Sequence, residues 1–269
     1  MCPGPLLRRM ALTAVALLIA GLASPASALA EGGSDAGGRI AFAAAPSGSF
    51  DFDVFTVRPD GSGLRQLTNG PAGHSSFNTA WSPDGRVIAF DSDRTGVVQL
   101  FTMRADGSDV RQLTHDAGHN RGPAWSPDGT RIAFDSDRTG PGTSAVYQMR
   151  PDGSHVRRLT PLALDAFGAD YAPDGRHVAL SSNLDALASA IYVIRPDGSD
   201  LRQLTSPPSG GGGDADVSYS PDGRKLVFVS DRRGGDADLW VMNADGTHLS
   251  DITPSPGAQF VPDWGPTKS

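Results

Sequence analysis

The sequence is poor in residues on which several classes of protein depend. Its one cysteine, Cys2, excludes a disulfide framework and a zinc site built from cysteines. Basic residues are outnumbered by acidic ones, 23 against 30, and the net charge of −7 counts against a nucleic-acid binder. The apolar run near the N-terminus, 10–23, is about 14 residues long, short of the roughly 20 that cross a bilayer as a helix.

Glycine and proline are abundant by contrast. The 269 residues include 33 glycines and 21 prolines, while aromatic residues make up only 7%. Glycine and proline are both costly inside helices, so this composition argues against a helical bundle. It favours a loop-rich, all-β protein.

The first thirty residues have the order of a secretory signal peptide. Arg8 and Arg9 precede the apolar run, and small residues follow it up to Ala30. We expect cleavage after Ala30, a short linker at 31–37, and one domain at 38–269. The chain is then secreted or placed in the periplasm or cell envelope, with no membrane span after cleavage. The alternative is an uncleaved membrane anchor.

A five-residue element recurs along the chain and marks a repeat. It joins an aromatic residue to Pro-Asp-Gly, and successive aromatic residues are 44 to 48 positions apart. The intact copies are Trp81–Gly85, Trp125–Gly129, Tyr171–Gly175 and Tyr219–Gly223, and a degenerate copy is Trp264–Pro266. One aromatic residue per unit is best interpreted as packing between units.

Each unit contains three further segments. A short apolar run lies at 40–42, 87–90, 132–134, 178–180 and 226–228. A segment of alternating aliphatic and aromatic residues lies at 54–57, 100–103, 146–149, 191–194 and 239–242. After an Asp-Gly turn, a last segment ends in Leu-Thr or Ile-Thr at 67–68, 113–114, 159–160, 204–205 and 252–253. Such runs between Gly, Pro and Asp predict four strands per unit.

Four-stranded units repeated every 40–50 residues are typical of a β-propeller. The sequence therefore predicts an all-β fold, a five-bladed β-propeller of four-stranded antiparallel blades. The units begin with a second strand at Ile40 and end with a first strand at Phe260–Trp264. We expect this last strand to complete the first blade, which removes the open edge and favours a monomer. A six-bladed ring with one eroded blade is the alternative.

The repeat resembles the WD-like propeller repeat of TolB-type periplasmic proteins. The Pro-Asp-Gly, Ser-Asp-Arg and Arg-Gln-Leu-Thr elements carry the resemblance, which covers residues 38–264. TolB itself is similar only in part, because that family has an α/β domain ahead of a six-bladed propeller. The same repeat occurs beside hydrolase domains of the prolyl-oligopeptidase type, but this chain has no Gly-x-Ser-x-Gly nucleophile motif.

Candidate binding residues lie in the loops that such a propeller gathers on one rim. Three Asp-Arg pairs there suit a peptide terminus or a charged sugar, since loops on a rigid scaffold commonly carry function. Their recurrence favours a structural role, in which Ser and Asp cap the turns and Arg pairs with a neighbouring blade. The candidates are His74, Asp93, Arg94, His119, Asp137, Arg138, Asp165, Asp214, Asp231 and Arg232.

Metal binding and catalysis are weaker interpretations of the same loops. His74, His115 and His119 are able in principle to bind a metal or act as acid and base, although loop histidines more often do neither. Asp91–Gly96 resembles the opening of a calcium loop, but Thr102 stands where an EF-hand has its glutamate. No complete catalytic set is present and no cofactor is predicted. Whether a metal occupies the channel stays open.

Two hypotheses for function follow. The leading one is a non-catalytic, exported propeller that binds a protein or peptide at the rim, in the cell envelope or outside the cell, with no nucleic-acid partner. The alternative is an extracellular glycan- or polysaccharide-acting hydrolase or lyase that uses rim His and Asp residues. The fold hosts both classes, so the architecture does not decide between them.

Overall fold

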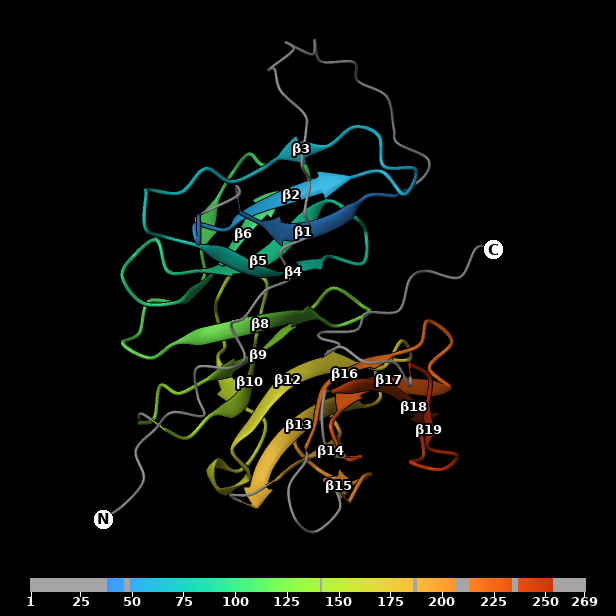
Figure 1. Cartoon of the computed structure of the whole chain (residues 1–269). Helices are drawn as coiled ribbons and strands as arrows, with labels where there is room; N and C mark the ends of the chain where they lie inside the picture. Colours follow the sequence, from blue (N-terminus) through green and yellow to red (C-terminus); the bar gives the residue numbers. More distant parts are fainter. Residues whose placement is uncertain are drawn as a thin grey trace, which may run out of the picture.

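The computed structural model describes residues 38–45, 49–140, 142–185, 188–206, 213–233 and 237–253. These residues form five antiparallel sheets that follow one another in chain order (Figure 1). Each sheet is one blade, and the predicted five-bladed β-propeller is confirmed. The one helical element among the described residues is a short 3-10 turn, η2 (Leu162–Leu164).

The strands of the five blades have the following bounds. The first blade has β1 (Ile40–Ala44), β2 (Asp53–Val57) and β3 (Arg65–Gln66). The second has β4 (Ser76–Trp81), β5 (Val87–Ser92), β6 (Gln99–Arg104) and β7 (Arg111–Gln112), and the third has β8 (Asn120–Trp125), β9 (Ile132–Ser136), β10 (Ala145–Met149) and β11 (Arg157–Arg158). The fourth has β12 (Ala166–Tyr171), β13 (Val178–Asp185), β14 (Ala188–Ile194) and β15 (Arg202–Gln203), and the fifth has β16 (Asp214–Tyr219), β17 (Lys225–Ser230), β18 (Asp238–Asn243) and β19 (Ser250–Asp251).

The repeated Leu-Thr pair follows the short fourth strand of each unit and fastens it to the third. In the second blade, Leu113 N donates to Leu100 O over 2.7 Å, and Leu100 N donates to Thr114 Oγ1 over 2.9 Å. The threonine hydroxyl thereby satisfies a backbone N–H that a two-residue strand leaves free. The other four units repeat the threonine contact, with distances of 2.8 to 3.0 Å.

The Pro-Asp-Gly turns are held by hydrogen bonds within each turn. Ser82 Oγ donates to Asp84 Oδ1 over 2.6 Å, and Gly85 N donates to Ser82 O over 2.8 Å. Gly85 has φ +68°, a left-handed conformation that glycine adopts without a steric cost. The hydrogen bond from Ser82 lowers the pKa of Asp84, because it stabilises the ionised carboxylate.

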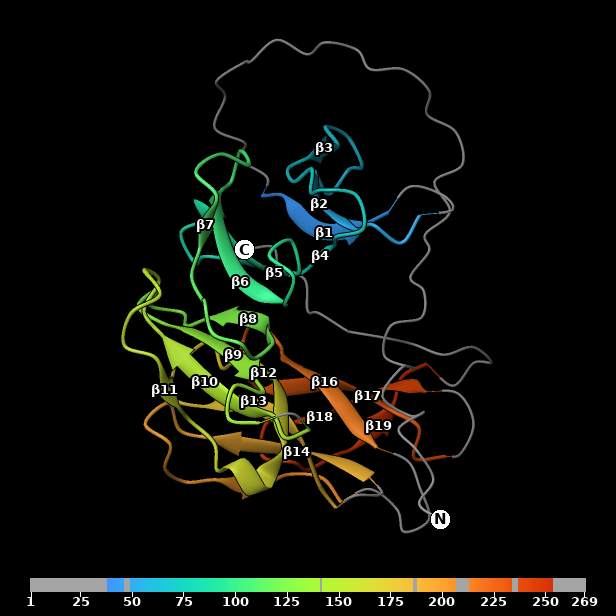
Figure 2. The ribbon, with the colours of Figure 1, turned by 90° about the vertical axis from the view of Figure 1, so that its left-hand side faces the viewer.

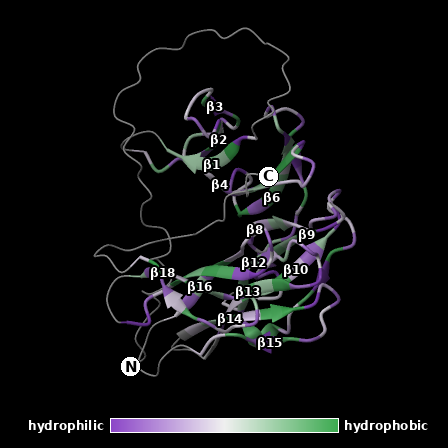
Figure 3. Cartoon of the chain, turned by 90° about the vertical axis from the view of Figure 1, so that its right-hand side faces the viewer, coloured by the Kyte–Doolittle hydropathy of each residue, from purple (hydrophilic) through white to green (hydrophobic). Residues whose placement is uncertain are grey.

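The hydrophobic core lies between neighbouring blades. Four clusters of buried side chains each combine residues of two consecutive sheets, stacked in sequence in Figure 2. Hydrophobic residues are concentrated in the strands, while the connecting turns are largely hydrophilic (Figure 3). The repeated aromatic residues join blades as expected: Trp125 Nε1 donates to Ala80 O of the preceding blade over 3.2 Å, and Tyr171 Oη donates to Gln148 Oε1 over 3.2 Å.

The first blade differs from the other four, since three of its strands are described. Trp81 Nε1 is buried and has no hydrogen-bond partner among the described residues, although the equivalent Trp125 has one on the preceding blade. The strand expected to complete the first blade, Phe260–Trp264, lies outside the described residues, as does the expected signal peptide at 1–30. Within the part of the chain that the structure describes, no helix has the length and apolar character to span a membrane.

Candidate functional site

The two rims of the propeller are built from different connections. We define the loop rim as the described residues that link the second strand of a blade to its third, together with those that link one blade to the next. The turn rim consists of the Pro-Asp-Gly and Asp-Gly turns. Nine of the ten predicted binding residues lie in loop-rim segments, and Asp214 is the first residue of β16. Asp91, at the start of the segment that resembles a calcium loop, lies within β5, while Asp135 lies within β9 and Asp216 within β16.

The aspartates of the Ser-Asp-Arg motifs tie two loops of the same blade together. Asp93 Oδ1 accepts a hydrogen bond from Ser75 N over 2.6 Å, and Asp137 Oδ1 accepts one from His119 N over 2.7 Å. Asp231 accepts the equivalent bond from Gly213 N. A carboxylate that bonds a backbone amide fixes the relative position of the two segments.

The arginines of these motifs lie over two aromatic rings of their own blade. The guanidinium carbon of Arg138 is 5.2 Å from the ring centre of Phe134 and 4.7 Å from that of Tyr147. Its Nη2 donates to Asn120 Oδ1 over 2.6 Å. Arg94 is placed in the same way. Stacking holds these arginines on their own blade, and two of them also meet a charge from the neighbouring blade. Arg138 Nη2 is 3.1 Å from Asp116 Oδ2, on the connection from the second blade to the third, and the charge of Asp53 in the first blade acts on Arg94.

Arg232 makes the most buried version of this contact. Its Nη2 is 2.7 and 2.6 Å from the two carboxylate oxygens of Asp214. The side chain of Arg232 is 11% exposed and that of Asp214 is 0% exposed. Trp240 and Phe228 lie under the guanidinium, with Trp240 the nearer at 4.8 Å. The pair is thus part of the fifth blade's interior as well as of its rim.

The fourth blade, which lacks Ser-Asp-Arg, uses an aspartate from the other loop. Asp165 has φ +44° and follows η2. Its Oδ1 accepts a bond from Ser144 N of the third blade over 2.6 Å, and its Oδ2 accepts one from Asn183 Nδ2 over 3.1 Å. Asp165 therefore links two blades, unlike the other aspartates of this set.

The two predicted histidines lie in separate blades. His74 Nδ1 is 2.9 Å from Asp93 O and 3.5 Å from Asp93 Oδ1. His119 Nδ1 accepts a hydrogen bond from Val98 N over 3.4 Å. Across the described ranges, no group of three or more His, Cys, Asp or Glu side chains is arranged to hold a metal ion. The structure thus brings the candidates together blade by blade, and their role in binding stays a prediction.

A further set of carboxyl groups lies where the blades meet near the channel axis. The first strands of successive blades pack against one another there. Burial raises the pKa of Asp91 to about 6 and that of Asp135 to about 7, while the charge of Arg121 opposes both shifts. Sequence reasoning named Asp91 only as the start of a calcium-like segment and did not choose either residue as a binding candidate. Their signal is an aspartate directly after an apolar run, which places it on a strand.

Phe50 was also missed, and it is the most exposed large apolar residue described, at 88%. Its backbone is held on the loop rim by the neighbouring blade: Ser75 Oγ donates to Phe50 O over 2.9 Å, and Gly73 N donates to Asp51 Oδ2 over 3.1 Å. Phe52, two residues on, packs against Phe77 with ring centres 5.0 Å apart. The side chain of Phe50 is thus displayed to solvent from an anchored loop.

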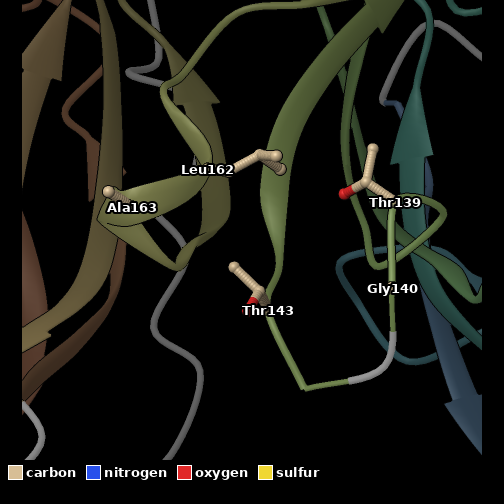
Figure 4. Close-up of a pocket in the computed structure, with 5 residues that line it drawn as sticks. All are labelled: Thr139, Gly140, Thr143, Leu162 and Ala163. Carbon is tan, nitrogen blue, oxygen red and sulfur yellow. The ribbon is translucent and has the colours of Figure 1, made fainter.

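A shallow hollow lies on the same rim, between the third and fourth blades. It is lined by Thr139, Gly140 and Thr143 of one loop and by Leu162 and Ala163 of the next. Figure 4 shows the threonine and leucine side chains around this space. The hollow offers apolar surface and two hydroxyl groups, which suits a side chain or short segment of a partner.

The comparisons with known proteins agree with the repeat and the fold. Residues 165–269 match the family model described as the TolB beta propeller domain. A search of curated proteins by sequence found no match. Five blades joined by Pro-Asp-Gly turns define a β-propeller of this repeat class, and the chain is a TolB-like propeller, as its resemblance implied.

Several solved structures share the architecture. TolB from Acinetobacter baumannii aligns with a TM-score of 0.71 and 23% identity, covering 81% of this chain and 53% of that one. Putative TolB from Agrobacterium tumefaciens aligns with a TM-score of 0.62 and 24% identity, covering 74% and 73%. Oligogalacturonate lyase from Vibrio parahaemolyticus aligns with a TM-score of 0.58 and 16% identity, covering 81% and 62%. This chain spans about half the length of the Acinetobacter TolB chain, and these likenesses concern the fold.

Proposed function

We propose that the chain is an exported, non-catalytic TolB-like propeller that binds a protein or peptide on its loop rim. The observation that carries the proposal is Phe50, an aromatic side chain with 88% exposure on an anchored loop. Aromatic residues dominate the energetics of protein interfaces, and a held backbone reduces the entropy lost on binding. The hollow at Thr139 and Leu162 adds a second point of contact on the same rim.

Capture of a partner by purified protein tests this proposal. The chain is immobilised, exposed to an envelope extract of the source organism, and the retained proteins are identified by mass spectrometry. Phe50→Ala is expected to reduce retention of a specific partner at least about tenfold, as loss of an interface anchor does. The matched control is Val110→Ala, which removes an exposed apolar side chain from the turn rim. Equal retention by both variants and the parent would refute the rim assignment.

The glycan-acting alternative is tested by activity. The parent and a His74→Ala/His119→Ala double variant are assayed against a panel of acidic and neutral polysaccharides. We expect no turnover by either protein. Turnover by the parent that disappears in the double variant would overturn the non-catalytic proposal, because both histidines lie on the loop rim.

Export is proposed from the order of residues in the first thirty positions. Expression of the full chain and N-terminal sequencing of the exported protein is expected to give Glu31 as the first residue. A protein retained with residues 1–30 in the membrane fraction would indicate an anchor instead. Light scattering on the exported protein tests the expected monomer.

A further inference from the structure

The first strand of each of the last four blades has a bulge at the same place, between its second and fifth residues. The residue inside each bulge has a positive φ, and these residues are Asn78, Gly122, Gly168 and Asp216, at 42°, 59°, 61° and 54°. The strands β4, β8, β12 and β16 pack on one another from blade to blade. The four bulges therefore follow one another around the axis, close to the loop rim where these strands begin.

Carboxylates connect the bulges of consecutive blades. Asp91 Oδ2 accepts a hydrogen bond from Asn78 Nδ2 of its own blade over 2.7 Å and one from Gly122 N of the next blade over 2.9 Å. Asp135 Oδ1 accepts a long bond of 3.4 Å from Gly168 N of the blade after that. An aspartate on the second strand of one blade thus accepts a hydrogen bond from the backbone N–H of the bulge in the following blade. This contact joins the second blade to the third and the third to the fourth.

This series stops at the fourth blade. Ser181 occupies the position that aspartate holds before it, since it pairs with Phe167 as Asp135 pairs with Arg121. The Ser181 side chain is 0% exposed, and its Oγ has no hydrogen-bond partner among the described residues. A Cβ built on Gly168 would lie 3.8 Å from that Oγ, so the hydroxyl adjoins the same bulge that donates to Asp135.

The next bulge also departs from the series, because Asp216 stands where the third and fourth blades have glycine. Strand β16, which carries it, packs directly on β13, which carries Ser181. Among the described residues, the Asp216 carboxylate has no hydrogen-bond partner, and burial raises its pKa. In the fifth blade, Val229 takes the position of Ser181, so the series of polar residues at this position ends there.

Three consecutive blades therefore carry acceptors with unused hydrogen-bonding capacity: Asp135, whose bond from Gly168 N is long, Ser181 and Asp216. A buried polar group without a partner costs free energy, so a ligand that donates hydrogen bonds to all three is stabilised there. Arg121 lies across from Asp135, but its side chain is exposed, and burial is what raises the pKa of Asp216. Because no three metal-ligating side chains converge in the described ranges, the chemistry favours an organic cation over a metal ion.

We propose that Asp135, Ser181 and Asp216 form a subsite for the ammonium or guanidinium group of a lysine or arginine side chain. The subsite deepens the proposed function and rests on it, because the basic side chain would belong to a protein or peptide held at the loop rim. The two carboxylates supply charge, and the serine hydroxyl supplies a buried acceptor between them. A guanidinium is suited to bridging, since it presents five N–H donors in a planar array.

Small probes test the subsite without knowledge of the partner. Binding of N-acetyl-arginine amide and N-acetyl-lysine amide to the full chain is measured by NMR titration. N-acetyl-citrulline amide, a neutral analogue of the arginine probe, serves as the matched ligand control. We expect saturable binding of the charged probes and at least about tenfold weaker binding of the citrulline probe.

Variants locate the site. Asp216→Asn is expected to weaken binding of the arginine probe about tenfold or more, because the acceptor of the hydrogen bond is then no longer charged. Asparagine fits a left-handed bulge, as Asn78 shows at the equivalent place. Ser181→Ala is expected to weaken binding about threefold. The control Asp106→Asn, on the turn rim, is expected to leave binding unchanged, and unfolding curves establish that each variant is folded.

The outcomes separate this subsite from the proposed function. Absence of probe binding, equal binding of citrulline, or saturable binding of calcium in place of the probes would overturn the subsite. If partner capture still depends on Phe50, the proposed function stands while the subsite fails. If probe binding is confirmed but no partner depends on Phe50, the rim proposal fails and the channel site remains.

Discussion

The carboxylates of the turn rim and those of the channel wall have opposite properties. Asp84 and Asp106 are typical of the turn rim: a neighbouring serine hydroxyl and a backbone amide two residues on lower their pKa. Asp91, Asp135 and Asp216 are on the channel side, and burial raises the pKa of each. The turn-rim residues of this kind are Asp60, Asp84, Asp106, Asp128, Asp152, Asp197, Asp222 and Asp245.

This difference shows how one residue type serves two purposes in the same repeat. In the turns, aspartate is ionised, solvated and supplied with donors, so it stabilises local structure. On the channel wall, aspartate is buried or half-buried, and the loss of solvation is unfavourable for its ionised form. Groups of the second kind are candidates for function, since perturbed pKa values concentrate at functional sites.

The largest expected effect comes from breaking the buried charge pair on the loop rim. Arg232→Met removes the partner of Asp214, which is 0% exposed, and should lower the free energy of unfolding by about 3–5 kcal/mol. Arg86→Met on the turn rim is the control: Arg86 and Asp84 are 84% and 58% exposed and 3.9 Å apart, so the loss should stay below about 0.5 kcal/mol. Urea unfolding measures both.

A double variant distinguishes the stability lost because a charge is left buried from the stability lost because side-chain packing changes. Adding Asp214→Asn to Arg232→Met should restore part of the lost stability, because no uncompensated carboxylate is then left in the interior. If the two single variants are as stable as the parent, the fifth blade does not depend on this pair.

A smaller effect is expected at the channel bulges. Gly122→Ala places a Cβ 2.9 Å from Asp135 Oδ1 at a residue with φ +59°, and should cost about 2 kcal/mol. Gly168→Ala has a similar φ of +61° but meets only Ser181 Oγ, at 3.8 Å, so it should cost about 1 kcal/mol. Thermal unfolding of the two variants compares them, and a larger loss for Gly168→Ala would contradict the described contacts.

The smallest expected effect is on how the free energy of unfolding depends on pH. The sign of this dependence should be opposite for the channel wall and the turn rim. The pKa of Asp135 is raised from 3.8 to about 7, so the stability it contributes is present below pH 3.8 and is lost as pH rises through 7. Relative to the parent, Asp135→Asn should therefore gain about 1 kcal/mol of stability between pH 5 and pH 8, a figure reduced because Asp135 is partly exposed. The charges facing Asp135 are Asp91 and Arg121.

Asp106→Asn supplies the opposite case. The pKa of Asp106 is lowered by its bonds to Ser108, so its contribution is present above pH 3.8 and is lost as pH falls further. Unfolding curves from pH 2 to pH 8 for both variants follow the two trends. Parallel curves would remove the distinction between the turn rim and the channel wall.

Sequence reasoning predicted the blades well and the candidate site only in part. The segments at 87–90 and 100–103 lie within β5 and β6, and the motif around Asp93 lies on the loop rim as expected. The aromatic partners of the arginine in that motif were missed, because only the packed sheet brings Phe90 and Phe101 beneath Arg94. Phe50 was missed, since nothing in a sequence distinguishes an exposed phenylalanine from a buried one.

The amino-acid sequence by itself determined the features that depend on near neighbours. These are the turn at Ser82–Asp84, where the hydrogen bond joins residues two positions apart, and the four short strands of each unit. Tertiary structure alone decided what faces the channel. Asp91 meets Gly122 across 31 positions, and Asp135 meets Gly168 across 33, each from the adjoining blade. Short-range hydrogen bonds are encoded locally, whereas these contacts arise only when whole blades pack around an axis.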